Sequence, residues 1–93
     1  MTPVELFTER FNRFNHFETV QEHFAKINIF VSIIPDAFKY DTPCWRGIME
    51  WKDDDVWHQD DCGCYSSPHE CRLKITKMAM EYCIDHKIDY INV

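Results

Sequence analysis

The fold class of this chain is decided by the stretch Ile27-Asn28-Ile29-Phe30-Val31-Ser32-Ile33-Ile34. Its residues alternate between two sides, and β-branched side chains make up one of them, as is typical of a strand that buries one face. Pro35 has no backbone N–H for a further ladder bond, so we expect the strand to end there. The stretch predicts a sheet, and the flanking segments must supply the rest of its core.

Helical patterns precede this strand. Thr2-Pro3-Val4-Glu5 has the form of a capping box with proline at the first helical position, and Asn15-His16-Phe17-Glu18 offers a second helix start. The pattern predicts two consecutive short helices, or one long helix bent near Asn15. Each segment carries an apolar stripe at helical spacing, which we assign to the core. The stripes consist of Phe7, Phe11 and Phe14 in the first segment, and of Phe17, Val20, Phe24 and Ile27 in the second.

The segment after the strand permits two interpretations. Thr42-Pro43 suits a further helix start. Ile48–Trp51 and Val56–His58, which flank the polar run Lys52-Asp53-Asp54-Asp55, instead suit the two arms of a hairpin. We favour the hairpin.

A third capping box begins the last helix. Ser67-Pro68-His69-Glu70 predicts a helix that continues to His86, and Ile88–Val93 then reads as a short strand that pairs with the strand at residues 27–34. Cys83 is interpreted as a small buried hydrophobe. The other apolar residues on the core face of this helix are Cys71, Ile75, Met78, Ala79 and Tyr82.

These elements together predict an α+β fold. Two N-terminal helices and a long C-terminal helix pack on a small β-sheet, and a Cys/His-rich turn precedes the last helix. Because 93 residues suffice for one hydrophobic core and not for two, we expect a single domain over residues 1–93. The hydrophobic content of 45% is high enough to bury such a core.

The cysteine count and the N-terminal residues bear on the compartment. No basic stretch followed by an apolar run opens the sequence, and no segment approaches the roughly 20 apolar residues that a membrane span needs. We therefore expect a cytoplasmic protein without membrane contact. Five cysteines is an odd number, which fits reduced thiols or metal ligands better than a disulfide framework.

A zinc site is the first candidate for chemistry, because five possible ligands fall within fourteen residues. Zinc takes four ligands in a tetrahedral arrangement, and a Cys-Gly-Cys turn ahead of a helix can direct two thiolates inward. Against this, the spacing is not that of the familiar Cys-x₂-Cys pair, so ordinary thiols and histidines remain the alternative. The candidate ligands are Cys62, Cys64 and Cys71, with His69 or His58 as the fourth and Cys44 in reserve; an iron–sulfur cluster is a lesser alternative.

Acidic residues are concentrated in the middle of the chain. The formal net charge is -6, and the segment Asp36–Asp61 holds eight acidic and three basic residues. Such a field repels nucleic-acid phosphates and attracts a protein with a basic surface. A solvated loop is the simpler interpretation, but the neighbouring tryptophans also suit a protein-binding surface. The predicted partner-binding residues are Trp51, Asp53, Asp54, Asp55, Trp57, Asp60 and Asp61.

The sequence leads to two functional hypotheses. The first is a small non-enzymatic interaction domain, with or without a zinc ion, that inhibits or modulates a larger basic protein, including one that handles nucleic acid. A phage or mobile-element protein directed at a host system would have this profile. The second is a small metal- or cysteine-dependent enzyme in which one of Cys44, Cys62 and Cys64 works with His58 or His69. An exposed tryptophan cluster also permits a homodimer.

Overall fold

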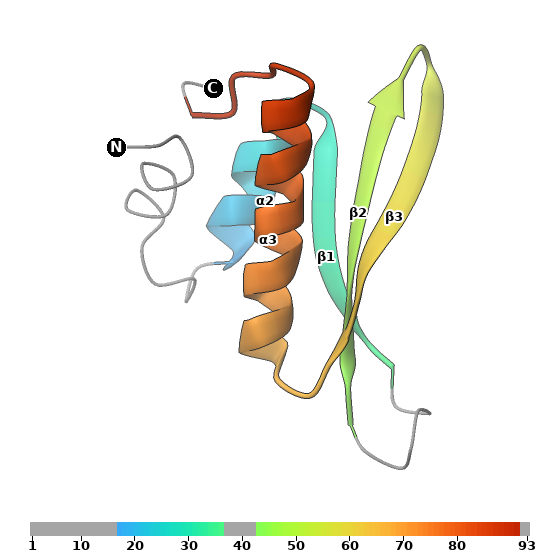
Figure 1. Cartoon of the computed structure of the whole chain (residues 1–93), viewed down its shortest axis with the longest axis vertical. Coiled ribbons are helices and arrows are strands. Elements are labelled where there is room, and N and C mark those ends of the chain that lie inside the picture. The colour runs from blue at the N-terminus through green and yellow to red at the C-terminus, as the bar shows by residue number, and fades with distance from the viewer. Residues whose placement is uncertain (1–16, 37–42, 92–93) are drawn as a thin grey trace.

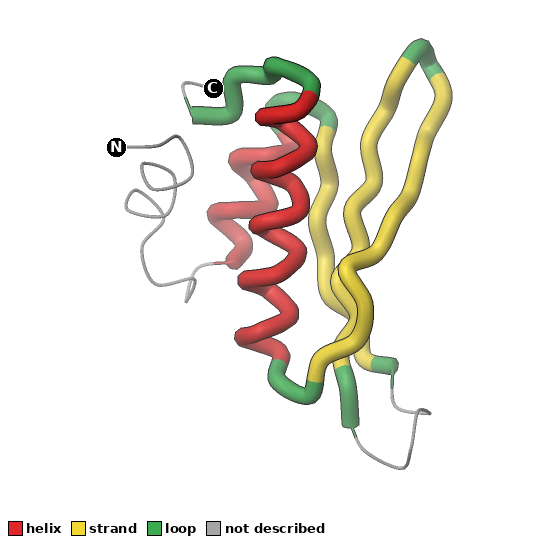
Figure 2. The backbone as a smooth tube through the Cα atoms, in the orientation of Figure 1, coloured by secondary structure: helices red, strands yellow, loops and turns green. Residues whose placement is uncertain are grey.

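The computed structural model describes residues 17–36 and 43–91 of the chain. Within these ranges α2 (Phe17–Ala25) precedes the strands β1 (Ile29–Pro35), β2 (Trp45–Asp53) and β3 (Val56–Tyr65), and α3 (Pro68–Asp85) follows them. The strands form one layer and both helices lie against one face of it (Figures 1 and 2). The predicted α+β class is confirmed.

The three strands form an antiparallel sheet in the order β1-β2-β3. β2 and β3 are joined by the two residues Asp54 and Asp55, which have φ angles of 49° and 64°. Positive φ at both positions is the conformation of a type I′ turn, whose twist matches that of the paired strands. The hairpin interpretation of residues 45–58 is confirmed, and the hairpin continues to Tyr65.

The core lies between the helical layer and the sheet. α3 packs against all three strands, whereas α2 packs against β1 and α3. The predicted stripe of α2 is confirmed, because Val20 and Phe24 are buried and Phe17 and Ile27 pack against the core. The other buried apolar residues are Ile29, Val31, Met49, Cys71, Ile75, Ala79, Met80, Cys83 and Tyr90.

The start of α3 has the predicted cap. The Ser67 side chain accepts a hydrogen bond of 3.3 Å from the backbone N–H of Glu70, and Pro68 occupies the first helical position. This arrangement satisfies one of the N–H groups that a helix start leaves without an internal partner. The cap fixes where α3 begins, directly after the cysteine-rich end of β3.

That cysteine-rich end is a bulged strand and not the predicted turn. Ile48 pairs with Asp61 while Gly47 pairs with Gly63, so Cys62 is an extra residue in β3. Gly63 has a φ of 94°, which a residue with a Cβ atom adopts only with strain. The bulge changes the face of the sheet to which the neighbouring side chains point. The alternating pattern of the sequence did not predict this bulge.

Gly47 lets α3 approach the sheet closely beside this bulge. A Cβ atom at this position would lie 2.5 Å from the Cys62 Sγ, 2.9 Å from the Ile75 Cβ and 3.4 Å from the Cys71 Sγ. The first two distances are shorter than any normal contact, so the space above Gly47 is already filled by the core. The sequence analysis did not single out this glycine.

Two predicted elements do not match the described structure. The helix predicted from Thr2-Pro3 lies outside the described residues, and within them one helix, α2, precedes the sheet, so the prediction of two N-terminal helices does not fit. The strand predicted for Ile88–Val93 is wrong for residues 88–91, which are irregular. There the Ile88 N–H bonds to the Cys83 carbonyl, and Tyr90 is buried with its ring stacked on Phe24 at 6.1 Å.

α2 also contacts the backbone of the edge strand β1. The Gln21 side chain of α2 donates a hydrogen bond of 2.8 Å to the Val31 carbonyl. A side chain from α2 therefore already uses a backbone acceptor of β1.

No helix in the described part of the chain has the length and apolar character needed to cross a membrane.

Candidate functional site

A groove of about 470 Å³ lies between α3 and the β2–β3 hairpin. The hairpin diverges from α3 toward its turn (Figure 1), and the lining residues from α3 belong to the C-terminal half of this helix and its cap. Its volume is within the range of roughly 300–1,000 Å³ that is usual for ligand sites. The lining residues are Met49, Trp51, Asp53, His58 and Asp60 from the hairpin, and Met78, Glu81, Tyr82, Asp85 and His86 from α3 and its C-cap.

Four aromatic rings form a continuous wall in this groove. The His58 ring stacks on Trp51 with 5.4 Å between centroids, and Trp51 contacts Tyr82 at 5.2 Å. Tyr82 in turn stacks on His86 at 4.1 Å. The rings come from β3, β2, α3 and the residue after α3, so the wall joins the two sides of the groove.

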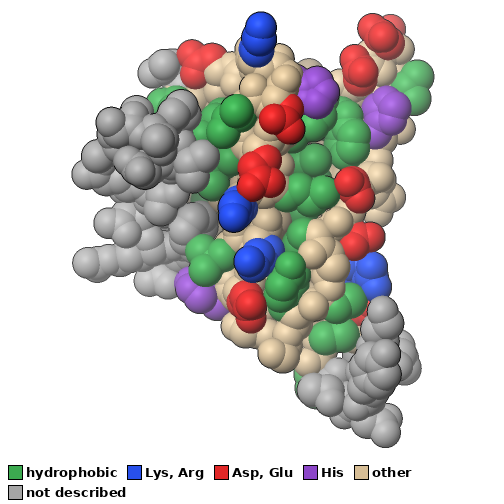
Figure 3. All heavy atoms as spheres, in the orientation of Figure 1, with side chains coloured by type: hydrophobic (Ala, Val, Ile, Leu, Met, Phe, Trp, Pro, Cys, Tyr) green, Lys and Arg blue, Asp and Glu red, His purple; other side chains and the backbone are tan. Residues whose placement is uncertain are grey.

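Carboxylates line both sides of the groove. Asp53 and Asp60 belong to the hairpin, and Glu81 and Asp85 belong to α3. No lysine or arginine of the described residues lines the groove. In the space-filling view, acidic and histidine side chains lie around hydrophobic ones on this face (Figure 3).

Ion pairs and hydrogen bonds within the chain neutralise little of this negative charge. Glu81 has an exposed ion pair with Lys77 at 3.9 Å, a type of contact that contributes little. The Oδ1 atom of Asp60 accepts a hydrogen bond of 2.8 Å from the Asp61 N–H, a neutral donor that leaves the charge of the carboxylate in place. Burial, followed by the charge of Asp53, raises the pKa of the Tyr82 phenol above its ordinary value. The phenol therefore keeps its proton and can donate a hydrogen bond.

The structure divides the predicted partner-binding residues between two faces of the sheet. Trp51, Asp53 and Asp60 line the groove on the helix side. Trp57 lies on the other face, where its ring contacts Phe30 at 5.6 Å. Asp61 is also on that outer side, where it pairs with Arg46 at 3.4 Å. The remaining two, Asp54 and Asp55, form the turn of the hairpin.

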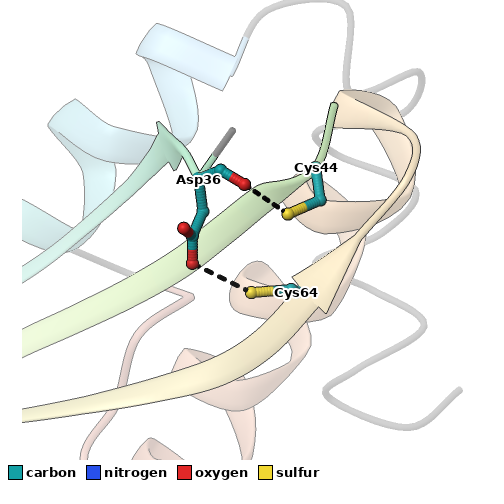
Figure 4. Close-up of side chains that lie close together, drawn as sticks. All are labelled: Asp36, Cys44 and Cys64. Atoms are coloured by element: carbon teal, nitrogen blue, oxygen red, sulfur yellow. Dashed lines mark hydrogen bonds between the residues drawn. The ribbon is translucent and has the colours of Figure 1, made fainter. Parts of the chain in front are cut away.

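A second cluster of chemically active groups lies at the opposite end of the hairpin. Among the described residues, Asp36, Cys44 and Cys64 form the one group of three whose donor atoms all lie within 4.8 Å of one another. The Cys44 thiol donates to the Asp36 carbonyl at 2.6 Å, and the Cys64 thiol donates to the Asp36 carboxylate at 3.4 Å (Figure 4). Two sulfur atoms and a carboxylate form a donor set that zinc accepts.

Arg46 contacts the same carboxylate. Its Nη2 atom is 3.0 Å from the Asp36 Oδ2, and its Nη1 atom is 3.4 Å from the Asp61 Oδ2. Burial and the hydrogen bond with Asp36 raise the pKa of the Cys64 thiol, while the charge of Arg46 opposes this shift. A metal ion here would have to compete with the guanidinium for Asp36 and remove the thiol protons.

The other two cysteines near the bulge face the core. Cys62 and Cys71 lie on the helix side of the sheet, with both sulfur atoms within 3.4 Å of the point where a Gly47 Cβ would be. Burial, followed by the neighbouring Cys62, raises the pKa of Cys71 to about 12, and burial also raises that of Cys62. Protonated thiols among apolar side chains behave as small hydrophobes, so this pair contributes to packing.

The five predicted zinc ligands are therefore distributed over separate places. Cys64 belongs to the cluster with Asp36 and Cys44, Cys62 and Cys71 belong to the core, and His58 stacks on Trp51 in the groove. His69 is exposed in the first turn of α3. All five cysteines are free thiols. The reserve ligand Cys44 joined the cluster, whereas Asp36 was missed because it lies far upstream in sequence.

Sequence reasoning also missed the helical side of the groove. Tyr82 and Met78 were assigned to the core face of the last helix, and they do pack against it. Glu81, Asp85 and His86 carried no signal of their own, because charged residues near a helix end usually face solvent. Their place in the groove depends on how the hairpin packs against α3, which the sequence pattern does not reveal.

Comparison with protein-family models, curated proteins and solved structures gave no match.

Proposed function

We propose that this chain is a small non-enzymatic interaction domain that binds a basic segment of a partner protein in the groove between α3 and the β2–β3 hairpin. By occupying that segment, the domain acts as an inhibitor or modulator of the larger protein. The observation that carries this proposal is the composition of the groove lining, which has four carboxylates and no lysine or arginine from the described residues.

The chemistry of the groove supports a cationic occupant in two ways. Carboxylates on both walls attract a cation, and aromatic rings bind cations through the negative charge on their faces. The methionines Met49 and Met78 offer flexible apolar contact to the aliphatic part of a long basic side chain. The net charge of -6 would also increase the rate at which a basic partner arrives.

Calorimetric titration with synthetic peptides tests the proposal. A peptide in which arginine and lysine alternate with glycine and serine should bind at about 0.1 M ionic strength, where charges act over about 10 Å. A peptide of equal length with glutamate in place of the basic residues should not bind. Absence of binding by the basic peptide would refute the proposed function.

A pair of double variants separates the groove from general charge. Asp60→Asn with Asp85→Asn removes two charges from the groove and should weaken binding about tenfold, the effect of two exposed ion pairs worth roughly 0.7 kcal/mol each. Asp54→Asn with Asp55→Asn removes the same charge from the turn, where asparagine tolerates positive φ. The turn variant should bind nearly as well as the wild type, and equal losses in both variants would count against the groove.

The cluster of Asp36, Cys44 and Cys64 favours metal binding as a second candidate function. Three protein ligands and a water molecule would complete a four-coordinate zinc ion, and the ion would tie the start of β2 to the end of β3. Elemental mass spectrometry on protein purified without a metal-affinity tag tests this assignment. Zinc near one ion per chain should be lost in Cys44→Ser and Cys64→Ser and kept in Cys62→Ser, whose thiol lies on the core side. Loss in Cys62→Ser with retention in Cys44→Ser would instead favour the originally predicted ligands.

A further inference from the structure

The rings of the groove contact one another and do not enclose an empty space. Tyr82 and His86 stack at 4.1 Å with 26° between their planes, and Trp51 and His58 stack at 5.4 Å with 18°. A methylated ammonium group is bound by rings that surround it on several sides. Because these rings pack against one another, a cation can stack only on the ring surfaces that still line the groove.

The carboxylates of the groove come from both of its sides. Asp53 and Asp60 lie on the hairpin, and Asp85 lies in the last turn of α3. A cation bound in the groove would therefore meet carboxylate acceptors from both sides as well as aromatic rings. This combination places a geometric demand on the ligand that a simple attraction between opposite charges does not.

We propose that the groove selects the guanidinium group of an arginine side chain over the ammonium group of a lysine. The guanidinium is planar, stacks on aromatic rings and directs five N–H donors outward in its own plane. Stacked on the Trp51–Tyr82 part of the wall, it can donate to carboxylates on both sides. A lysine ammonium is a compact, strongly hydrated charge that gains little from a flat surface. This inference rests on the proposed function and specifies the residue type that the partner supplies.

Two peptides with the same charge and spacing test the selectivity. One contains arginine and the other lysine at every basic position, with glycine and serine between them, and both are titrated into the full chain by calorimetry. The arginine peptide should bind about tenfold more tightly, since stacking and paired hydrogen bonds add to the shared charge attraction. Equal affinity would overturn the selectivity while leaving the proposed function intact. If neither peptide binds, the proposed function itself fails.

Tyr82 variants show whether the aromatic wall is the cause. Tyr82→Leu should reduce the arginine preference to about twofold or less, because the stacking surface is lost while the carboxylates remain. Tyr82→Phe keeps the ring and should retain most of the preference, which also controls for a fold damaged by changes at this position. Trp57→Leu removes an aromatic ring from the outer face of the sheet and should leave the preference unchanged. An undiminished preference in folded Tyr82→Leu protein would contradict the stacking role.

Discussion

At the scale of single residues, Gly47 decides how near α3 comes to the sheet. Its missing side chain leaves room for the Cys62 thiol and the Ile75 side chain directly over β2. Ile75 belongs to the first half of α3, and the residues of α3 that line the groove follow in its second half. We infer that the contact above Gly47 helps to position the groove, although Gly47 does not line it.

We predict that Gly47→Ala destabilises the protein by about 1–3 kcal/mol, the usual effect of adding a methyl group to a filled core. The new Cβ would come within 2.5 Å of the Cys62 Sγ and 2.9 Å of the Ile75 Cβ. Urea unfolding followed by far-ultraviolet circular dichroism measures the change.

The double variant Gly47→Ala with Cys62→Ala provides the control. Removing the sulfur relieves the shorter contact and should recover part of the lost stability relative to Gly47→Ala, whereas Cys62→Ala alone should be mildly destabilising. If Gly47→Ala unfolds at the same urea concentration as the wild type, α3 does not approach β2 as closely as these distances require.

At the scale of elements, the turn between β2 and β3 requires positive φ angles and has an aspartate, Asp55, at a position that prefers glycine. Asp54 and Asp55 have φ angles of 49° and 64°; aspartate is common at the first of these positions, whereas the second strongly prefers glycine. Asp55 also makes an exposed ion pair with Lys52 at 3.5 Å, which offsets little of the conformational strain. The turn is held by the pairing of the strands and by the need to join them with two residues.

We predict that Asp55→Gly stabilises the protein by roughly 0.5–1 kcal/mol, since glycine adopts positive φ without a Cβ clash. The gain should appear as a higher urea midpoint with an unchanged slope. Asp55→Ala removes the same charge and the same ion pair but keeps a Cβ, so it should not be stabilising. A gain of equal size in both variants would assign the effect to charge and not to backbone conformation.

Helices and strands with a strong local signal were predictable from sequence, and those determined by tertiary contacts were not. The Ser67 cap and the alternation through β1 gave α3 and the first strand directly. Residues 88–91 were predicted to belong to a short terminal strand, but there Tyr90 packs on Phe24. The bulge at Cys62 shifted the cysteines to opposite faces, so ligands that are neighbours in sequence are separated in space.

At the scale of the whole molecule, two buried thiols connect stability to alkaline pH. Burial raises the pKa of Cys71 and of Cys83 to about 12, against an ordinary value of 9.0. Between these values the folded chain keeps two protons that the unfolded chain releases. The contribution is complete below about pH 9 and is lost as pH rises toward 12.

We predict that the free energy of unfolding is nearly constant from about pH 7 to 8.5 and falls above about pH 9, by up to roughly 1.4 kcal/mol per pH unit for each thiol. Urea unfolding in a reducing buffer at several pH values measures the slope. In Cys83→Ala one titrating group is gone, so the decline should be shallower although the protein is less stable at pH 7. A flat profile between about pH 9 and 10 would contradict the burial of both thiols.

β3 is an edge strand of the described sheet, which has a consequence for the way copies of this chain meet. A bare edge strand ordinarily invites strand addition, which leads to fibrils. Here the carboxylates of Asp60 and Asp61 accept hydrogen bonds from the N–H groups of Asp61 and Gly63, at 2.8 and 2.9 Å. A second β3 would meet adjacent negative charges and donors that are already engaged. Asp60 and Asp61, of which Asp60 also lines the proposed binding groove, therefore make the addition of a second copy along this edge of the sheet unfavourable.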